Sequence, residues 1–288
     1  MKKIISFVVS VILLITVISV GAVAADRPVY LVLGDSIAYG SGLDNPREAC
    51  YGRIVADTNG YDYVNHSVPG HTTSNLISRL NEDAVIADLK RADIISISIG
   101  GNNFLMSNLI GLMFDSMVMG DYTEFDAIAE NFYNEFCEVM DIINAHNPDA
   151  VVLMQTLYNP QSEPLRAPYQ QGADRINAAI ERYNKEHPGE IVIVDVATAL
   201  GDDMANYAGD DIHPSAKGNE EIAKAVLAKL YELKLGSNTQ PIINTAGTDI
   251  EISPIFTTPM TVMGYSFNFI ADLVSIIKVT VNFIVSLF

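Results

Sequence analysis

Tryptophan is absent from the 288 residues, and cysteine occurs only at positions 50 and 137. The lack of tryptophan disfavours a platform on which sugars stack, although tyrosine can serve there. Neither a C-x-x-C nor an H-E-x-x-H pattern occurs, so the sequence gives no support for a zinc site. One disulfide bond and two free thiols both remain open for Cys50 and Cys137, because sequence alone gives no distance between them.

Basic residues are also scarce. The 17 lysines and arginines stand against 35 aspartates and glutamates, which gives a formal net charge of −18. A surface this acidic repels a phosphate backbone, so no nucleic-acid partner is expected. The charge says little about neutral ligands.

The first residues have the order of an export signal. Lys2 and Lys3 precede an apolar run, which ends in the small residues Ala22-Val23-Ala24. This order predicts a signal peptide over residues 1–25, with a retained N-terminal anchor as the alternative. We therefore expect a secreted or cell-surface protein in which residues 26–236 form one folded domain.

Short runs rich in β-branched residues alternate with longer amphipathic segments. The expected strands are 29–33, 61–66, 94–99, 151–156 and 191–194, and the expected helices are 73–90, 122–145, 168–186 and 216–235. Strand alternating with helix predicts an α/β fold, doubly wound, with a parallel sheet covered on both faces. In such folds, functional residues gather at the carboxyl ends of the strands.

The composition changes after residue 236. Residues 237–261 contain Gly, Pro, Thr and Asn with little periodicity, which predicts a linker. Residues 262–288 are strongly apolar, with polar residues every three or four positions, and this predicts a C-terminal apolar helix with one polar stripe. Membrane-surface docking, a membrane span, self-association and packing on the protein's own body stay open for it. Asp272 and Lys278 would make a span costly.

The stretch LVLGDSIAYGSG, residues 31–42, places Ser36 where the first strand should end. A turn followed by a helix cap would explain Asp35 and Ser36. The alternative is a nucleophile held at a strand end. No G-x-S-x-G pattern surrounds Ser36, which excludes the nucleophile elbow of the α/β-hydrolases. A serine nucleophile would also need a base, an orienting acid and donors for an oxyanion.

Three later segments can supply these groups. In GDDIHPSAKG, residues 209–218, the carboxylate of Asp210 can reach Nδ1 of His213 across a turn and leave Nε2 free to accept a serine proton. Asp211 is the competing acid, but its side chain should point elsewhere. Gly70 and Asn102 follow the second and third strands and can offer a backbone N–H and a side-chain amide. Taken singly, each segment is equally explained as an ordinary loop.

Taken together, these blocks resemble those of the GDSL hydrolases, also called SGNH hydrolases. The similar segments are Gly34-Asp35-Ser36, Gly70 with Asn65 before it, Gly100-Gly101-Asn102-Asn103, and Asp210 to His213. The resemblance covers about residues 28–235 and implies a three-layer α/β/α sandwich with a five-stranded parallel sheet of the flavodoxin-like type. It also implies a catalytic triad of Ser36, Asp210 and His213, with Ser36, Gly70 and Asn102 as oxyanion donors. Asn103 stands where the family generally has Asp, which puts the rigidity of the Asn102 loop in question.

The activity implied is hydrolysis of a carboxylic ester, of the lipase or esterase type, through an acyl-enzyme and without a metal or organic cofactor. The expected partner is a small-molecule or lipid ester. The Met-rich segment 104–120 predicts an acyl-chain wall or a lid, with a core helix as the alternative. Asp35, Asn103 and Phe104 are further candidates for substrate binding. A polysaccharide O-deacetylase and a surface-binding protein without turnover are the competing hypotheses.

Overall fold

The computed structural model describes residues 27–251, except 109–110, 113–114 and 163–164, together with residues 260–262 and 265–267. One sheet is built from β1 (Val29–Gly34), β2 (Asp62–Asn65), β3 (Ile94–Ser98), β4 (Val151–Gln155) and β5 (Ile191–Val194). The strands are all parallel and lie in the order β2-β1-β3-β4-β5. The predicted five-stranded parallel sheet and its flavodoxin-like order are confirmed.

The central strands are apolar on both sides because helices cover both faces of the sheet. On β1, Leu31 and Leu33 face one hydrophobic core, whereas Tyr30 and Val32 face the other. This alternation follows from the period of two in a strand.

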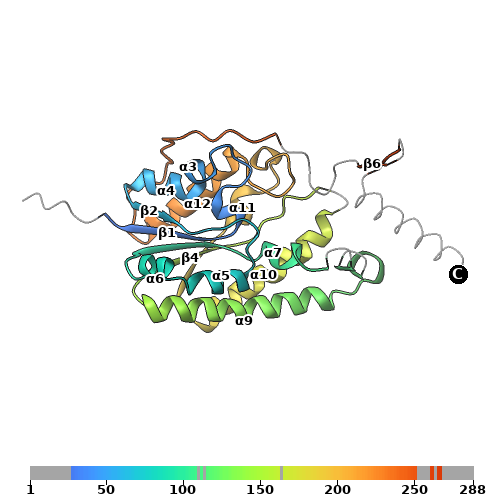
Figure 1. The fold of residues 1–288 in the computed structure, drawn as a ribbon, viewed down its shortest axis with the longest axis horizontal. Helices are drawn as coiled ribbons and strands as arrows, with labels where there is room; N and C mark the ends of the chain where they lie inside the picture. The colour runs from blue at the N-terminus through green and yellow to red at the C-terminus, as the bar shows by residue number, and fades with distance from the viewer. Residues whose placement is uncertain are drawn as a thin grey trace, which may run out of the picture.

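The helices form two layers, one on each face of the sheet (Figure 1). One layer holds α4 (Tyr51–Asn59), α11 (Val196–Leu200) and α12 (Ala216–Glu232), and the other holds α5 (Thr73–Leu80), α6 (Asp83–Leu89), α9 (Thr123–His146) and α10 (Arg166–Glu186). The predicted three-layer sandwich is therefore confirmed. Shorter helices, α2 (Ser36–Tyr39), α3 (Pro46–Ala49) and α7 (Gly101–Leu105), lie in the connections.

The single helix predicted over residues 73–90 is wrong. α5 ends at Leu80 and α6 begins at Asp83. Asn81 terminates α5, and its side-chain amide donates to the carbonyl of Ile77 at 2.9 Å. An asparagine side chain that bonds to nearby backbone competes with the helix in this way.

The two cysteines are free thiols. The Sγ atom of Cys50 lies 3.2 Å from the hydroxyl of Tyr63, which packs on the core of one face of the sheet. Cys137 packs on the core of the other face. The sheet separates them, so the two-thiol alternative holds.

The described residues test the C-terminal predictions only in part. Residues 260–262 and 265–267 pair as antiparallel strands β6 (Met260–Val262) and β7 (Tyr265–Phe267), so a helix beginning at residue 262 is wrong there. The predicted signal peptide, 1–25, and residues 268–288 of the predicted helix lie outside the described residues. Within the described ranges, no helix combines the length and apolar character that crossing a membrane requires.

Candidate active site

Ser36 lies at the carboxyl end of β1, at the start of α2. Gly34 has φ +127°, and a Cβ there would lie 1.9 Å from the carbonyl oxygen of Ser98, so only glycine fits. The N–H of Asp35 donates to that same oxygen at 3.0 Å. Asp35 Oδ1 then accepts from the N–H of Ile37 at 3.0 Å and caps α2. The N–H of Ser36 is one of the helix-initial amides that have no intrahelical acceptor.

The carboxyl group of Asp35 is buried beside the candidate nucleophile. Burial raises the pKa of Asp35 to about 7, although the hydrogen bond from Ile37 and the nearby His213 act in the opposite direction. Asp35 lines the same cavity as Ser36. Asp35 therefore caps α2 and also lies next to the candidate nucleophile.

Asp210 and His213 form the predicted pair. Asp210 Oδ2 is hydrogen-bonded to Nδ1 of His213, and Asp210 Oδ1 accepts from the backbone N–H groups of His213 at 2.9 Å and Ile212 at 3.0 Å. Burial opposes ionisation of Asp210, but the hydrogen bonds from His213 and Ile212 hold its pKa below the ordinary value. A charged carboxylate on Nδ1 fixes the imidazole orientation and stabilises a protonated ring.

The choice between Asp210 and Asp211 is explained by the backbone. Asp211 has φ +62°, the left-handed region, whereas the carboxylate of Asp210 folds back on the turn. Two residues of the connection between β4 and α10 donate hydrogen bonds to this turn. The Tyr158 hydroxyl donates to the carbonyl of Ile212 at 2.7 Å, and the buried Gln161 donates to the carbonyl of Asp211. Sequence reasoning missed Tyr158 and Gln161, since no local motif marks them.

The two predicted oxyanion segments meet after β2 and β3. Gly70 has φ +81°, and a Cβ there would meet only the Met106 side chain, at 3.9 Å, so its backbone can approach a ligand. The side-chain amide of Asn102 donates to the carbonyl of His71 at 3.0 Å. An amide group carries two N–H donors, so this bond leaves one for a substrate oxygen.

Asn103 braces this region. Its Oδ1 accepts from the backbone N–H of Thr73 at 3.2 Å and from the Thr73 hydroxyl at 3.0 Å. Its Nδ2 donates to Glu135 on α9 at 3.5 Å. Asn103 thus ties α7 to both α5 and α9, and the asparagine performs the acceptor role that an aspartate could also fill.

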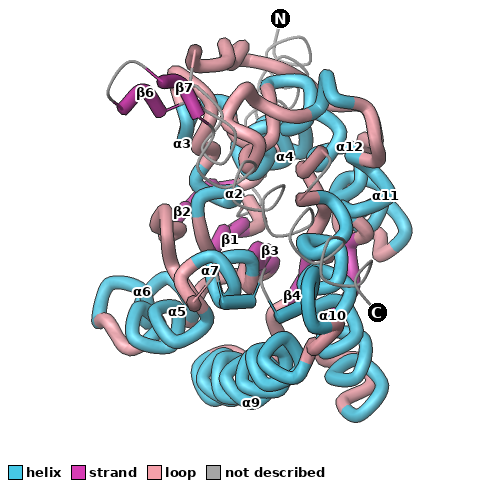
Figure 2. The backbone as a smooth tube through the Cα atoms, turned by 90° about the vertical axis from the view of Figure 1, so that its right-hand side faces the viewer, coloured by secondary structure: helices cyan, strands magenta, loops and turns pink. Residues whose placement is uncertain are grey.

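Ser36 and Asn102 line one cavity of about 370 Å³ at the carboxyl end of the sheet, whereas Gly70, Asp210 and His213 are not part of its lining. Figure 2 shows α2 and α7 beside the ends of β1 and β3. The lining includes Asp35, Ser36, Ile37, Gly101, Asn102, Leu105, Leu157, Tyr158, Tyr169 and Ile212. His213 follows Ile212, and a Cβ at Gly42 would lie 3.1 Å from its Cβ. In the described part of the chain, no hydrogen bond joins the Ser36 hydroxyl to His213.

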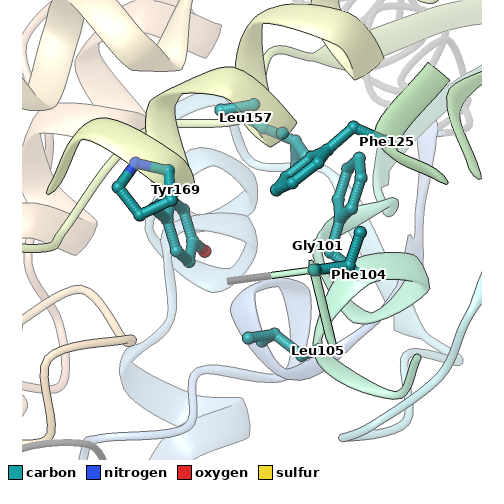
Figure 3. Close-up of a pocket in the computed structure, with 10 residues that line it drawn as sticks. Gly101, Phe104, Leu105, Phe125, Leu157 and Tyr169 are labelled. Carbon is teal, nitrogen blue, oxygen red and sulfur yellow. The ribbon is translucent and has the colours of Figure 1, made fainter. Parts of the chain in front are cut away.

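A second cavity of about 390 Å³ adjoins the first (Figure 3). Its lining consists of Gly101, Phe104, Leu105, Leu112, Phe125, Leu157, Pro168, Tyr169, Gly172 and Ala173. Phe104 thus lies in the second cavity and not beside Ser36. Over the described ranges, no group of three or more His, Cys, Asp or Glu side chains is arranged to hold a metal ion.

The chain is similar to a known protein family and to known proteins. Residues 32–221, more than half of the chain, match the GDSL-like lipase/acylhydrolase family. The spore germination lipase LipC of Bacillus licheniformis is 26% identical over 212 residues, covering 70% of this chain and 96% of LipC. The uncharacterized protein YpmR of Bacillus subtilis strain 168 is 25% identical over 214 residues, covering 69% of this chain and 79% of YpmR.

Two solved structures share the fold. The lipase Lip_vut3 from a goat rumen metagenome has a TM-score of 0.59 at 23% identity, covering 70% of this chain and 96% of its own. TesA has a TM-score of 0.51 at 22% identity, covering 71% of this chain and 99% of its own. With its family blocks after β1, β2 and β3 and in the turn before α12, the chain belongs to the GDSL-like lipase/acylhydrolase family of lipase- and esterase-like hydrolases.

Proposed function

We propose that the protein is a serine hydrolase that cleaves carboxylic esters through a covalent acyl-enzyme. The observation that carries the proposal is the hydrogen-bonded pair of the buried Asp210 and the partly exposed His213, which lies at the same end of the sheet as Ser36 and Asn102. Ser36 is the nucleophile, His213 the general base and Asp210 the residue that orients the imidazole.

The proposed first half-reaction begins when an ester carbonyl enters the cavity. His213 Nε2 takes the Ser36 proton as Oγ bonds to the carbonyl carbon, and it returns that proton to the leaving alcohol as the ester bond breaks. This step needs Ser36 and His213 to come within hydrogen-bond distance once substrate is bound. Catalytic hydrogen bonds are often loose before substrate binds and tighten in the complex. Water, activated by the same histidine, then releases the acid.

The oxyanion of each tetrahedral intermediate would be held by three donors: the N–H groups of Ser36 and Gly70 and the free N–H of Asn102. The helix-initial position of Ser36 and the open backbone at Gly70 support these roles. Removing one such donor typically costs about 3 kcal/mol of barrier. None of the donors titrates in the working range, so the proposed oxyanion site keeps its donors as the pH changes.

The apolar second cavity, which adjoins the cavity at Ser36, favours an ester of an apolar acid over an acetylated polysaccharide. An acetyl group has one methyl to bury, whereas the second cavity offers a lining made almost wholly of apolar side chains. Export directed by residues 1–25 belongs to the same proposal, and N-terminal sequencing of the mature protein would check it by locating cleavage near Ala25.

The test uses hydrolysis of p-nitrophenyl butyrate by Ser36→Ala, His213→Ala and Asp210→Asn. We expect kcat to fall by about 10⁴-fold or more for each variant, because each removes a part of one unit. Asp211→Asn is the matched control on the same turn, since asparagine tolerates the left-handed backbone there. Full activity in folded Ser36→Ala would exclude Ser36 as the nucleophile.

A further inference from the structure

Gly172 is out of place by the rules of helix formation. It lies inside α10, a helix of 21 residues, where glycine is disfavoured relative to alanine. Its backbone does not require glycine, because its φ is not positive. Its packing does not require glycine either, because a Cβ would meet the rings of Phe104 and Phe125 at 3.4 Å, an ordinary contact distance.

What the missing side chain provides is space in the second cavity. Gly172 lies in the cavity lining together with Phe104 and Phe125, whose rings are 5.5 Å apart between centroids and are tilted by 36°. Both rings are buried, so the core fixes their positions. Any side chain at residue 172 would project between α10 and this aromatic pair.

The second cavity continues the one at Ser36. Gly101, Leu105, Leu157 and Tyr169 line both cavities and form their common boundary. Figure 3 shows Phe104 and Phe125 on one side of the second cavity and Tyr169 on another. Tyr169 carries the one polar side-chain group among the lining residues. A ligand that extends from Ser36 into this space therefore meets apolar atoms almost throughout.

We propose that the second cavity binds the acyl chain of the ester and that Gly172 determines how long a chain it accepts. The inference rests on the proposed function, because the chain would be joined to the carbonyl that Ser36 attacks. The occupant is an unbranched apolar acyl group, since a sugar would bring hydroxyls into a lining that offers them almost no partners.

The test measures kcat/KM for p-nitrophenyl esters of two to twelve carbons with the wild type, Gly172→Ala and Gly172→Leu. For each variant, kcat/KM is expressed relative to that variant's own two-carbon ester, which carries the shortest acyl chain. For longer esters, we expect kcat/KM to fall by about fourfold for each methylene excluded from the cavity. The optimum should therefore move to shorter chains, and further for leucine than for alanine.

Thermal unfolding separates this effect from damage to the fold. Gly172→Ala should raise Tm, because alanine suits a helix interior better, even as the long-chain activity falls. Ala178→Leu, at an exposed position of the same helix, is the control and should keep the wild-type chain-length profile.

The possible failures are distinguishable. A wild type that hydrolyses no ester of the series would overturn the proposed function. A wild type that hydrolyses esters, with an unchanged chain-length profile in folded Gly172→Ala and Gly172→Leu, would overturn the role of Gly172 and of the cavity. If Gly172→Leu does not fold, Gly172→Ala still decides, because a Cβ fits at contact distance.

Discussion

The carboxyl group of Asp35 couples folding to pH. In the folded protein burial raises its pKa to about 7, whereas an ordinary aspartate titrates near 3.8. Below pH 3.8 both states hold the proton, and between about 4 and 7 only the folded state holds it. The stability contributed by this proton is therefore complete at low pH and is lost as pH rises to about 7.

Asp35→Asn isolates this effect, because asparagine keeps the cap on α2 and does not ionise. Urea unfolding of both proteins between pH 4 and 8 is the measurement. Relative to Asp35→Asn, the wild type should lose unfolding free energy as pH rises, by on the order of 4 kcal/mol at most. A difference that stays constant over this range would contradict the buried titration.

Asn103 provides a second test at a single residue. Asn103→Asp should keep the two bonds from Thr73 but place a carboxylate beside Glu135, where the amide now donates. A double-mutant cycle with Glu135→Gln measures this repulsion. We expect a coupling free energy of about 0.5–1 kcal/mol, with the Asn103→Asp substitution tolerated better once Glu135 has been neutralised. Additive effects would show that the Asn103–Glu135 contact contributes nothing.

The sequence predicted a residue's contacts only where the two partners lie close together along the chain. Asp210 and His213 meet across three residues, so their spacing was enough. Tyr158 and Gln161 reach the same turn from a different loop, and only the folded arrangement brings them there. Likewise, the sequence favours glycine at residue 34 as a turn, but the approach of Ser98 is visible only in the structure.

At the scale of elements, strands were easier to predict than helices. Buried parallel strands are continuous apolar runs, and each observed strand differs from its prediction by at most one residue at either end. α4, between β1 and β2, was not predicted, because it is short and contains Gly52. Gly52 is required there by packing, since a Cβ would lie 2.9 Å from Val32. Tertiary contact thus overrides local propensity in this helix.

Of the boundaries between elements, the junction of β1 with α2 should tolerate substitution least. Gly34→Ala would drive a Cβ into the Ser98 carbonyl and separate β1 from β3, so we expect a loss of about 4 kcal/mol or more in urea unfolding. Gly60→Ala is the matched control, because Gly60 also has a positive φ but nothing lies within 4 Å of its Cβ position. It should cost only the left-handed strain, about 1 kcal/mol. Equal losses would show that the contact with Ser98 does not matter.

At the scale of the whole molecule, the segment 237–251 wraps back over the domain (Figure 1). The N–H of Ile242 donates to the Thr58 hydroxyl at 2.8 Å, and the segment ends beside residues 42–44. There the N–H of Ile250 donates to the carbonyl of Gly42 at 2.9 Å. The predicted linker is therefore bound to the domain over its first part.

This segment reaches the start of α12, which follows the turn that holds Asp210 and His213. Asp249 Oδ1 accepts from the N–H of Ala216 at 2.6 Å, at the first turn of α12. On its other side, Asp249 pairs with Leu43, next to the Gly42 that packs on His213. A carboxylate at a helix N-terminus is favourable, so Asp249 links the segment to the element that follows His213.

Two truncations test whether this wrapping segment supports catalysis. Removing residues 252–288 leaves every described contact of the segment, whereas removing residues 237–288 abolishes them. The chain that ends at residue 236 should have a kcat on p-nitrophenyl butyrate about tenfold or more below that of the chain that ends at residue 251. We expect little change in KM, because the loop beside His213 loses its contacts with the segment while the second cavity is unchanged. Asp249→Ala in the full chain should reproduce part of the loss, and Glu251→Ala, exposed on the same segment, should not. Equal kcat in the two truncations would show that the turn bearing Asp210 and His213 keeps its function without residues 237–251.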